Sequence, residues 1–241
     1  MVQIPLINLK QIAFSYPGQP PIFKDLELLL GPGERIGLSA PNGSGKTTLF
    51  HLIMGLLQPT SGTIEIFGKH IVTGDDFFTV RRKIGLLFQD ADDQLFSPTV
   101  IEDVAFGPLN LGHSPEAARE ISLRTLKFLG LEKLADRVTF KLSGGEKKLV
   151  SLATVLAMEP EVLLLDEPTS GLDRDTKSRL IDILNDLALP SIIISHEFDF
   201  LSSTVEHIYT MDGGRILFDE ELHIHHHEHA HRLGKQPHKH I

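Results

Sequence analysis

The segment from position 40 to 47 constrains the fold of this chain more than any other. It reads Ala-Pro-Asn-Gly-Ser-Gly-Lys-Thr and lies between a predicted strand at 35–39 and a helix predicted to begin at Lys46. Apart from its first position, it matches the phosphate-loop pattern G-x-x-x-x-G-K-[ST]. Glycines let successive backbone N–H groups surround an anion, and the helix N-terminus adds partial positive charge. The sequence therefore predicts an α/β protein that binds nucleotide phosphates.

The residue types within this loop suit a triphosphate with its metal. Lys46 supplies a full positive charge to the β- and γ-phosphates, and the Thr47 hydroxyl can coordinate Mg²⁺. Ala40 replaces the first glycine of the pattern; its Cβ is harmless if φ is negative, and we expect a negative φ because the later glycines are retained. The predicted ATP-binding residues here are Ala40, Pro41, Asn42, Gly43, Ser44, Gly45, Lys46, Thr47 and Thr48.

A run of four apolar residues, Val162 to Leu165, is followed by Asp166 and Glu167. Such a run is typical of a buried parallel strand, and α/β sheets bind ligands at the carboxyl ends of their strands. We expect Asp166 to hold Mg²⁺ through water and Glu167 to polarise the attacking water as general base. A strand that ends in solvated acids is the plainer interpretation, but the phosphate loop upstream favours a Walker B motif.

The segment Leu142-Ser143-Gly144-Gly145-Glu146 resembles the LSGGQ signature of the ABC ATPase family, with Glu146 in place of glutamine. It is predicted to open a helix, so its N–H groups can form a second anion site. The resemblance implies that this site serves the ATP bound to the opposite subunit, in a head-to-tail homodimer that closes over two nucleotides. The residues so implied are Ser143, Gly144, Gly145 and Glu146.

Four further positions match motifs of the same family. Tyr16 matches the aromatic residue that stacks on adenine, and Asp173 lies in a matching D-loop. Gln89 matches the Q-loop glutamine, which senses Mg²⁺ and the membrane partner, and His196 matches the switch histidine that contacts the γ-phosphate. The resemblance thus implies a catalytic set of Lys46, Gln89, Glu167 and His196 and a Mg²⁺ set of Thr47, Gln89 and Asp166.

The resemblance also implies the architecture. It is an α/β P-loop NTPase of the ABC cassette type, with a RecA-like core, an antiparallel β subdomain and an inserted helical subdomain. We expect the ATPase domain to cover residues 1–222, with the helical insert at about 90–140. ATP and Mg²⁺ are the implied cofactors.

Local patterns predict alternating strands and helices. The predicted helices are one over about 46–57, one capped by Thr99 and Glu102, one from Ser114-Pro115 to Gly130, one from near Ser143, and one that carries Leu180, Ile183, Leu184 and Leu187. The predicted strands are 4–14, 35–39, 63–67, 84–88, 162–165 and 191–195, with two more around the turn at 212–214.

Composition excludes several classes of function. The chain has no cysteine, which excludes disulfides and thiolate metal sites, and its net charge of −9 argues against general nucleic-acid binding. No stretch approaches the ~18 consecutive apolar residues of a membrane span. Any membrane role must therefore work through a partner. The family resemblance implies that this partner is a set of integral membrane subunits on other chains, with this chain peripheral on the cytoplasmic face of the cell membrane.

The stretch after Gln89 bears on the transporter subtype. Residues 90–100 and 102–108 closely resemble the ATPases of energy-coupling-factor importers, which take up cobalt, nickel, biotin and other vitamins. The segment lies where family members meet their membrane partner. The structural alternative is that any ABC subunit needs some helical insert here.

The C-terminal tail, residues 223–241, is rich in histidine and is expected to be mobile. Neutral imidazole suits nickel, and cobalt less tightly, so the tail is a candidate metal-handling segment. An expression tag, a solvated low-complexity end and adventitious metal binding are the alternatives. The candidate Ni²⁺ or Co²⁺ ligands are His223, His225, His226, His227, His229 and His231.

Together these features favour the ATPase of a nickel or cobalt importer. One rival is the ATPase of a vitamin importer, such as one for biotin, with an incidental tail. Another is a non-transport ABC ATPase, although those usually carry long coiled-coil or second-cassette insertions. A third is a nickel storage protein or chaperone with a degenerate cassette, which the intact Lys46, Asp166, Glu167 and His196 oppose.

Overall fold

The computed structural model describes residues 4–41 and 43–218. The interpretations placed on Asn42 and on the histidines of the tail therefore lie outside the described residues.

The centre of the molecule is a six-stranded sheet in the order β10-β9-β3-β8-β7-β6. Four of its five strand pairings are parallel, and only the β9–β10 hairpin is antiparallel. The carboxyl ends of β3 and β7 therefore meet at one edge of the sheet, as a ligand-binding α/β sheet requires. The strands are β3 (Arg35–Ser39), β6 (Ile84–Leu87), β7 (Val162–Asp166), β8 (Ser191–Ile194), β9 (His207–Asp212) and β10 (Arg215–Phe218).

A second, antiparallel sheet has the order β2-β1-β4-β5. Helix α1 (Lys46–Ile53) buries Leu49, Phe50, Leu52 and Ile53 in one core with residues of both sheets, so this apolar helix fixes the two sheets to each other. The strands are β1 (Ile7–Phe14), β2 (Phe23–Leu30), β4 (Ser61–Ile66) and β5 (Lys69–His70).

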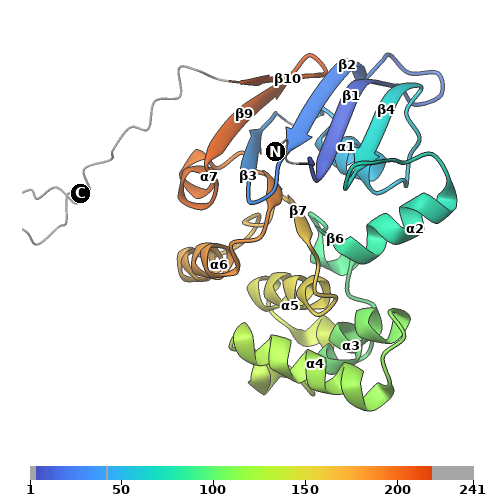
Figure 1. Cartoon of the computed structure of the whole chain (residues 1–241). Coiled ribbons are helices and arrows are strands. Elements are labelled where there is room, and N and C mark those ends of the chain that lie inside the picture. Colours follow the sequence, from blue (N-terminus) through green and yellow to red (C-terminus); the bar gives the residue numbers. More distant parts are fainter. Residues whose placement is uncertain (1–3, 42, 219–241) are drawn as a thin grey trace, which may run out of the picture.

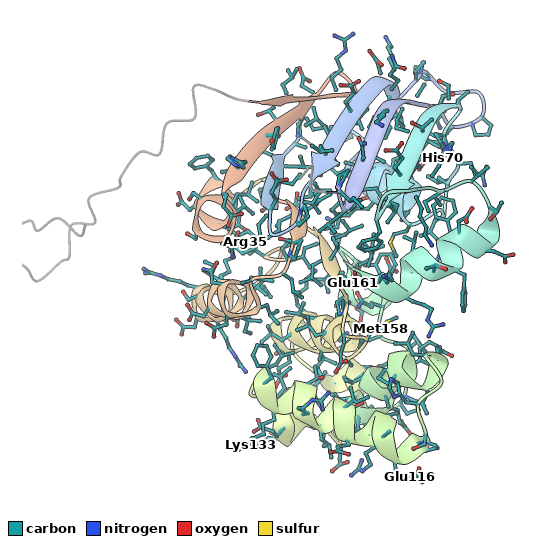
Figure 2. All side chains as sticks on the ribbon, in the orientation of Figure 1. Arg35, His70, Glu116, Lys133, Met158 and Glu161 are labelled. Atoms are coloured by element: carbon teal, nitrogen blue, oxygen red, sulfur yellow. The ribbon has the colours of Figure 1, made fainter. Side chains whose placement is uncertain are left out.

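Three helices form a layer at the opposite end of the molecule from β1, β2 and β4 (Figure 1). They are α3 (Val100–Asn110), α4 (Pro115–Phe128) and α5 (Gly144–Leu156), with short 3-10 turns at Ala91–Asp93, Glu132–Leu134 and Thr139–Lys141. In Figure 2 the labelled Glu116 and Lys133 mark the far end of this layer. The remaining helices are α2 (Gly74–Lys83), α6 (Arg174–Leu187) and α7 (Phe198–Thr204).

Strand β7 joins the two hydrophobic cores. Val162 and Leu164 pack with the antiparallel sheet and α1, whereas Leu163 and Leu165 pack with the helices. All four are at most 1% exposed, because successive side chains of a strand point to opposite faces and both faces are covered here. This explains why the strand reads as an unbroken apolar run.

The predicted helix starts are confirmed. The backbone N and hydroxyl of Thr99 donate to Glu102 at 3.0 and 2.7 Å, and Ser114 accepts from the Ala117 N–H at 3.2 Å. The predicted end of α1 near 57 is wrong. The helix ends at Ile53 because Gly55 takes a left-handed φ of 64°.

The described part of the chain contains no helix long and apolar enough to cross a membrane.

Candidate functional site

The phosphate loop connects β3 to α1, as predicted. Gly43 and Gly45 have φ of 82° and 97°, the left-handed region that favours glycine. A Cβ on Gly45 would also lie 2.5 Å from Ile22 and 2.9 Å from the ring of Phe23. Ala40 is not among the described residues with positive φ, so the predicted negative φ at this position is confirmed.

Lys46 is buried at the start of α1, only 9% exposed. Its Nζ donates to the Ala40 carbonyl at 3.2 Å and forms a 2.7 Å ion pair with Oε1 of Glu167. An ammonium group that is shielded from water needs such partners, because burying an unpaired charge costs free energy. The loop and the end of β7 are therefore joined by a buried ion pair.

Glu167 follows β7 in an unusual conformation. Its φ is 44°, which is unfavourable for a residue with a Cβ, and its N–H is held by the carbonyl of Ile194 at 2.9 Å. The carboxylate is 3% exposed, with Oε1 on Lys46 and Oε2 2.8 Å from Nδ1 of His196. His196 itself is 65% exposed. The structure thus brings together three of the four predicted catalytic residues.

Asp166 lies at the other half of the site. Its Oδ2 accepts a 2.8 Å hydrogen bond from Oγ1 of Thr47, while its Oδ1 is buried with no hydrogen-bond partner among the described residues. Burial raises the pKa of Asp166 above its usual value, although the bond from Thr47 opposes this. A carboxylate oxygen left without a donor beside a hydroxyl suits a hard, oxygen-ligated cation such as Mg²⁺.

Gln89 lies just beyond β6 and is exposed. It lines a cleft of about 700 Å³ together with Thr47, Asp166 and Gly144. The three predicted Mg²⁺ ligands therefore face one cleft, and their donors are all oxygens. The residues fit the ion on this ground.

Ser143 caps α5, with a hydrogen bond from its backbone N–H to Glu146 Oε2 at 2.8 Å and one from its hydroxyl at 2.9 Å. These bonds hold the pKa of Glu146 below its usual value. The glutamate therefore closes the capping box that a glutamine could also close. Ser143 and Gly144 are exposed, and a Cβ on Gly144 would meet no atom within 4 Å.

Two other predicted positions have clear local roles. The Tyr16 hydroxyl is 3.3 Å from Oγ1 of Thr48, and its ring packs edge-on against Phe14. Asp173 caps α6 by accepting hydrogen bonds from the N–H groups of Asp175 and Thr176, both at 3.0 Å. The hydrogen bonds that Thr176 donates hold the pKa of Asp173 below its usual value.

Comparison with known proteins identifies the family. The sequence model of the ABC transporter family matches residues 23–170, which is more than half of the chain. This chain belongs to the ABC transporter ATP-binding family. It is an ATPase with the ABC cassette fold, and the resemblance drawn from its motifs is confirmed.

Individual relatives of this ABC ATPase support the family assignment. A Nitratidesulfovibrio vulgaris protein named for ABC transporter ATP binding is 52% identical over 98% of this chain and 86% of its own length. The energy-coupling factor transporter ATP-binding protein EcfA of Methanothermobacter thermautotrophicus is 39% identical over 88% and 70%. The solved structure of cbiO1 from Clostridium perfringens, part of the ABC transporter complex cbiONQ, has a TM-score of 0.81 and 34% identity, covering 90% and 88%.

Sequence reasoning missed one buried cation beside the site of this ABC ATPase. Lys148 on α5 is 3% exposed and lines the same cleft as Asp166 and Gln89. Burial lowers the pKa of Lys148, and the carboxylates of Asp166, Asp90 and Glu167 oppose that shift. Its position on the apolar face of α5, four residues before the buried Leu152, was the available signal.

Proposed function

We propose that this ABC ATPase powers an importer of the energy-coupling-factor type, with nickel or cobalt as its cargo. The observation that carries the proposal is the convergence of Lys46, Glu167 and His196 beside the Thr47–Asp166 pair. Next to them is a groove that is lined in part by the importer-like segment 90–108. The similarity to the EcfA protein supports the transporter type.

Charge and geometry support the proposed ATP site. When ATP binds, its γ-phosphate would replace the carboxylate of Glu167 as the partner of Lys46. Tyr16 would stack on the adenine. Mg²⁺ would be held by Thr47, Gln89 and Asp166 and would neutralise charge on the β- and γ-phosphates. Phosphates of ATP would satisfy the buried ammonium at least as well as one carboxylate, because both are anionic acceptors.

Hydrolysis then needs Glu167 to be free of Lys46. Its carboxylate accepts a proton from water as the water oxygen bonds to the γ-phosphorus, and the bond from that phosphorus to the bridging oxygen breaks to release ADP. His196, at 2.8 Å, keeps the carboxylate oriented in the protein without ligand and would donate to the γ-phosphate when ATP is bound.

The exposed signature segment supports a head-to-tail dimer. The N-terminus of α5 offers a second set of N–H groups for anions, and Ser143 and Gly144 leave it accessible. A second copy of the chain would place its bound ATP against this helix end, so that closure of the dimer depends on the nucleotide.

The groove beside the site suits a segment of a membrane subunit. It has a volume of about 360 Å³ and is lined by Leu56, Phe96, Phe106 and Met158, with Met158 labelled in Figure 2. Asp103 also lines the groove; it is 2% exposed, and its Oδ2 has no hydrogen-bond partner among the described residues. An apolar segment with one donor would complete the groove, and the ATPase would sit peripherally on the cytoplasmic face of the membrane.

The choice of metal cargo rests on the histidine-rich tail, which lies outside the described residues. Imidazole groups favour nickel and bind cobalt less tightly. A vitamin such as biotin is the alternative cargo for an importer of this type. In that case the tail would have no part in recognising the transported substrate.

The test is transport by the complete complex. The chain is reconstituted with its membrane partners in vesicles, and ATP-dependent accumulation of nickel, cobalt and biotin is measured. Accumulation of nickel or cobalt that is lost in Glu167→Gln supports both engine and cargo. Accumulation of biotin alone overturns the metal assignment, and absence of any ATP-dependent uptake overturns the importer.

A further inference from the structure

Lys148 makes contacts that its place in the fold does not require. Its Nζ donates to the backbone carbonyl of Gln89 at 2.6 Å and to that of Phe88 at 3.3 Å. A buried ammonium is costly, and a leucine or methionine would suit the apolar face of α5 better if only packing were needed. The cation therefore points to a role at the loop that it holds.

Two more side chains bind the same loop to α5. Gln94 accepts from the N–H of Phe88 at 3.1 Å and donates to the Ser151 carbonyl and the Thr154 hydroxyl, both at 2.9 Å. Lys147 pairs with Asp92. The loop after β6 is thus fixed by side-chain contacts to the helix that begins at the signature segment.

The contact of Lys148 is the one nearest the chemistry. Its Nζ donates a hydrogen bond to the backbone carbonyl of Gln89, and Gln89 lines the same cleft as Thr47 and Asp166. A change in the position of α5 would therefore move the backbone of Gln89 directly, without passing through β6.

We propose that Lys148 is a positioning residue for ATP hydrolysis, which acts by fixing the backbone of Gln89 to α5 so that the glutamine side chain stays aligned with Thr47 and Asp166. The inference rests on the proposed role of Gln89 at the ATP site. It assigns Lys148 no contact with ATP.

The test is a double-mutant cycle on the reconstituted complex, with kcat and KM for ATP measured for Lys148→Met, Gln89→Ala and the double variant. We expect Lys148→Met to lower kcat by about tenfold and to change KM by less than about threefold, because alignment and not ATP binding is lost. The double variant should match Gln89→Ala alone, because residues that act through one another are not additive.

Conservative replacement and a matched lysine serve as controls. Lys148→Arg keeps a donor for the two carbonyls and should recover part of kcat, whereas a role in packing alone would be served better by methionine. Lys127→Met, on the exposed face of α4, should leave kcat and the melting temperature unchanged. If Lys148→Met does not fold, Lys148→Gln takes its place in the cycle.

The outcomes separate this inference from the proposed site. Full turnover by Gln89→Ala overturns the role of Gln89 and the inference with it. Slow turnover by Gln89→Ala with normal kcat in Lys148→Met overturns the inference alone. Multiplied losses in the double variant, or a loss confined to KM, also contradict it.

Discussion

At the residue scale, Glu167 combines three features that ordinary surface acids lack. It is buried, it has a left-handed backbone, and both of its oxygens are engaged by cationic or titratable side chains. A non-glycine residue in that backbone region costs about 1 kcal/mol or more and persists only where its surroundings hold it. The bond from its N–H to Ile194 and the pair with Lys46 provide that restraint.

Gly45 allows a direct test of the phosphate loop. Gly45→Ala should lower the free energy of unfolding by about 2 kcal/mol or more, because the new Cβ meets both a left-handed φ and the side chains of Ile22 and Phe23. Urea unfolding measures this. Gly74→Ala is the matched control, since no atom lies within 4 Å of its Cβ position, and equal loss in both variants would contradict the reading.

The chemistry of the site was largely predictable from residue types, but its contacts were not. The phosphate loop, Asp166 and Glu167 are fixed in the sequence by motifs whose spacing along strand and helix is local. The ion pair between Lys46 and Glu167 joins residues far apart in the chain, so no local pattern reports it. The hydrogen bond from Lys148 to the carbonyl of Gln89 also joins residues far apart in the chain, so the sequence could not predict it.

At the element scale, strands buried on both faces and capped helices were the most predictable parts. The sequence patterns did not predict β2, β5, α2 or α7. The alternation in β2 is broken because the β1–β2 register shifts between Leu26 and Phe23, opposite Ile12 and Phe14 of β1. Helix α2 buries only Phe77 and Val80, and α7 has seven residues, so neither carries a strong apolar period.

The start of β3 carries a pH-dependent contact. Glu206 accepts from the backbone N, Nε and Nη2 of Arg35 at 2.8, 2.9 and 2.7 Å, and Arg35 also donates to Asn185 on α6 (Arg35 is labelled in Figure 2). Partial burial raises the pKa of Glu206, but the bonds from Arg35 outweigh it and leave the pKa below 4.5.

This lowered pKa predicts how stability changes with pH. The ionised Glu206 stabilises the fold at pH values above the ordinary pKa of a glutamate. This contribution is lost as pH falls through the lower pKa of Glu206 in the folded protein. Glu206→Gln should therefore be less stable at neutral pH, by no more than about 1 kcal/mol because the pair is half-exposed, and the deficit should shrink in acid. Urea unfolding of this variant and of the exposed Glu120→Gln decides it; a pH-independent deficit would count against the pair.

At the scale of the whole molecule, β7 belongs to both hydrophobic cores and leads into Asp166 and Glu167, the proposed Mg²⁺ ligand and the proposed catalytic base. A movement of the helical layer would therefore act on one face of β7, the strand that leads into Asp166 and Glu167. The sequence could imply this arrangement only through its family resemblance, because the packing of two cores on one strand depends on contacts between distant segments.

The proposed dimer gives a prediction at this scale. Glu167→Gln should elute as a dimer in size-exclusion chromatography with ATP and as a monomer without it, because unhydrolysed ATP bridges two copies. Adding Ser143→Arg should abolish the ATP-dependent shift by blocking the exposed end of α5. Ser114→Arg removes the equivalent cap of α4 and should leave the shift intact; loss of the shift in both would mean that helix capping, not the signature face, is responsible.

ATP turnover by the reconstituted complex tests the central claim most directly, with Glu167→Gln compared with Glu161→Gln. These glutamates flank the two ends of β7, and Glu161, labelled in Figure 2, lies outside the site in a half-exposed pair with Lys83. Glu167→Gln should still bind ATP but lose about 100-fold or more in kcat, because the group that accepts the proton from water is gone. Glu161→Gln should turn over like the wild type, whereas wild-type kcat in Glu167→Gln would contradict the assignment of the catalytic base.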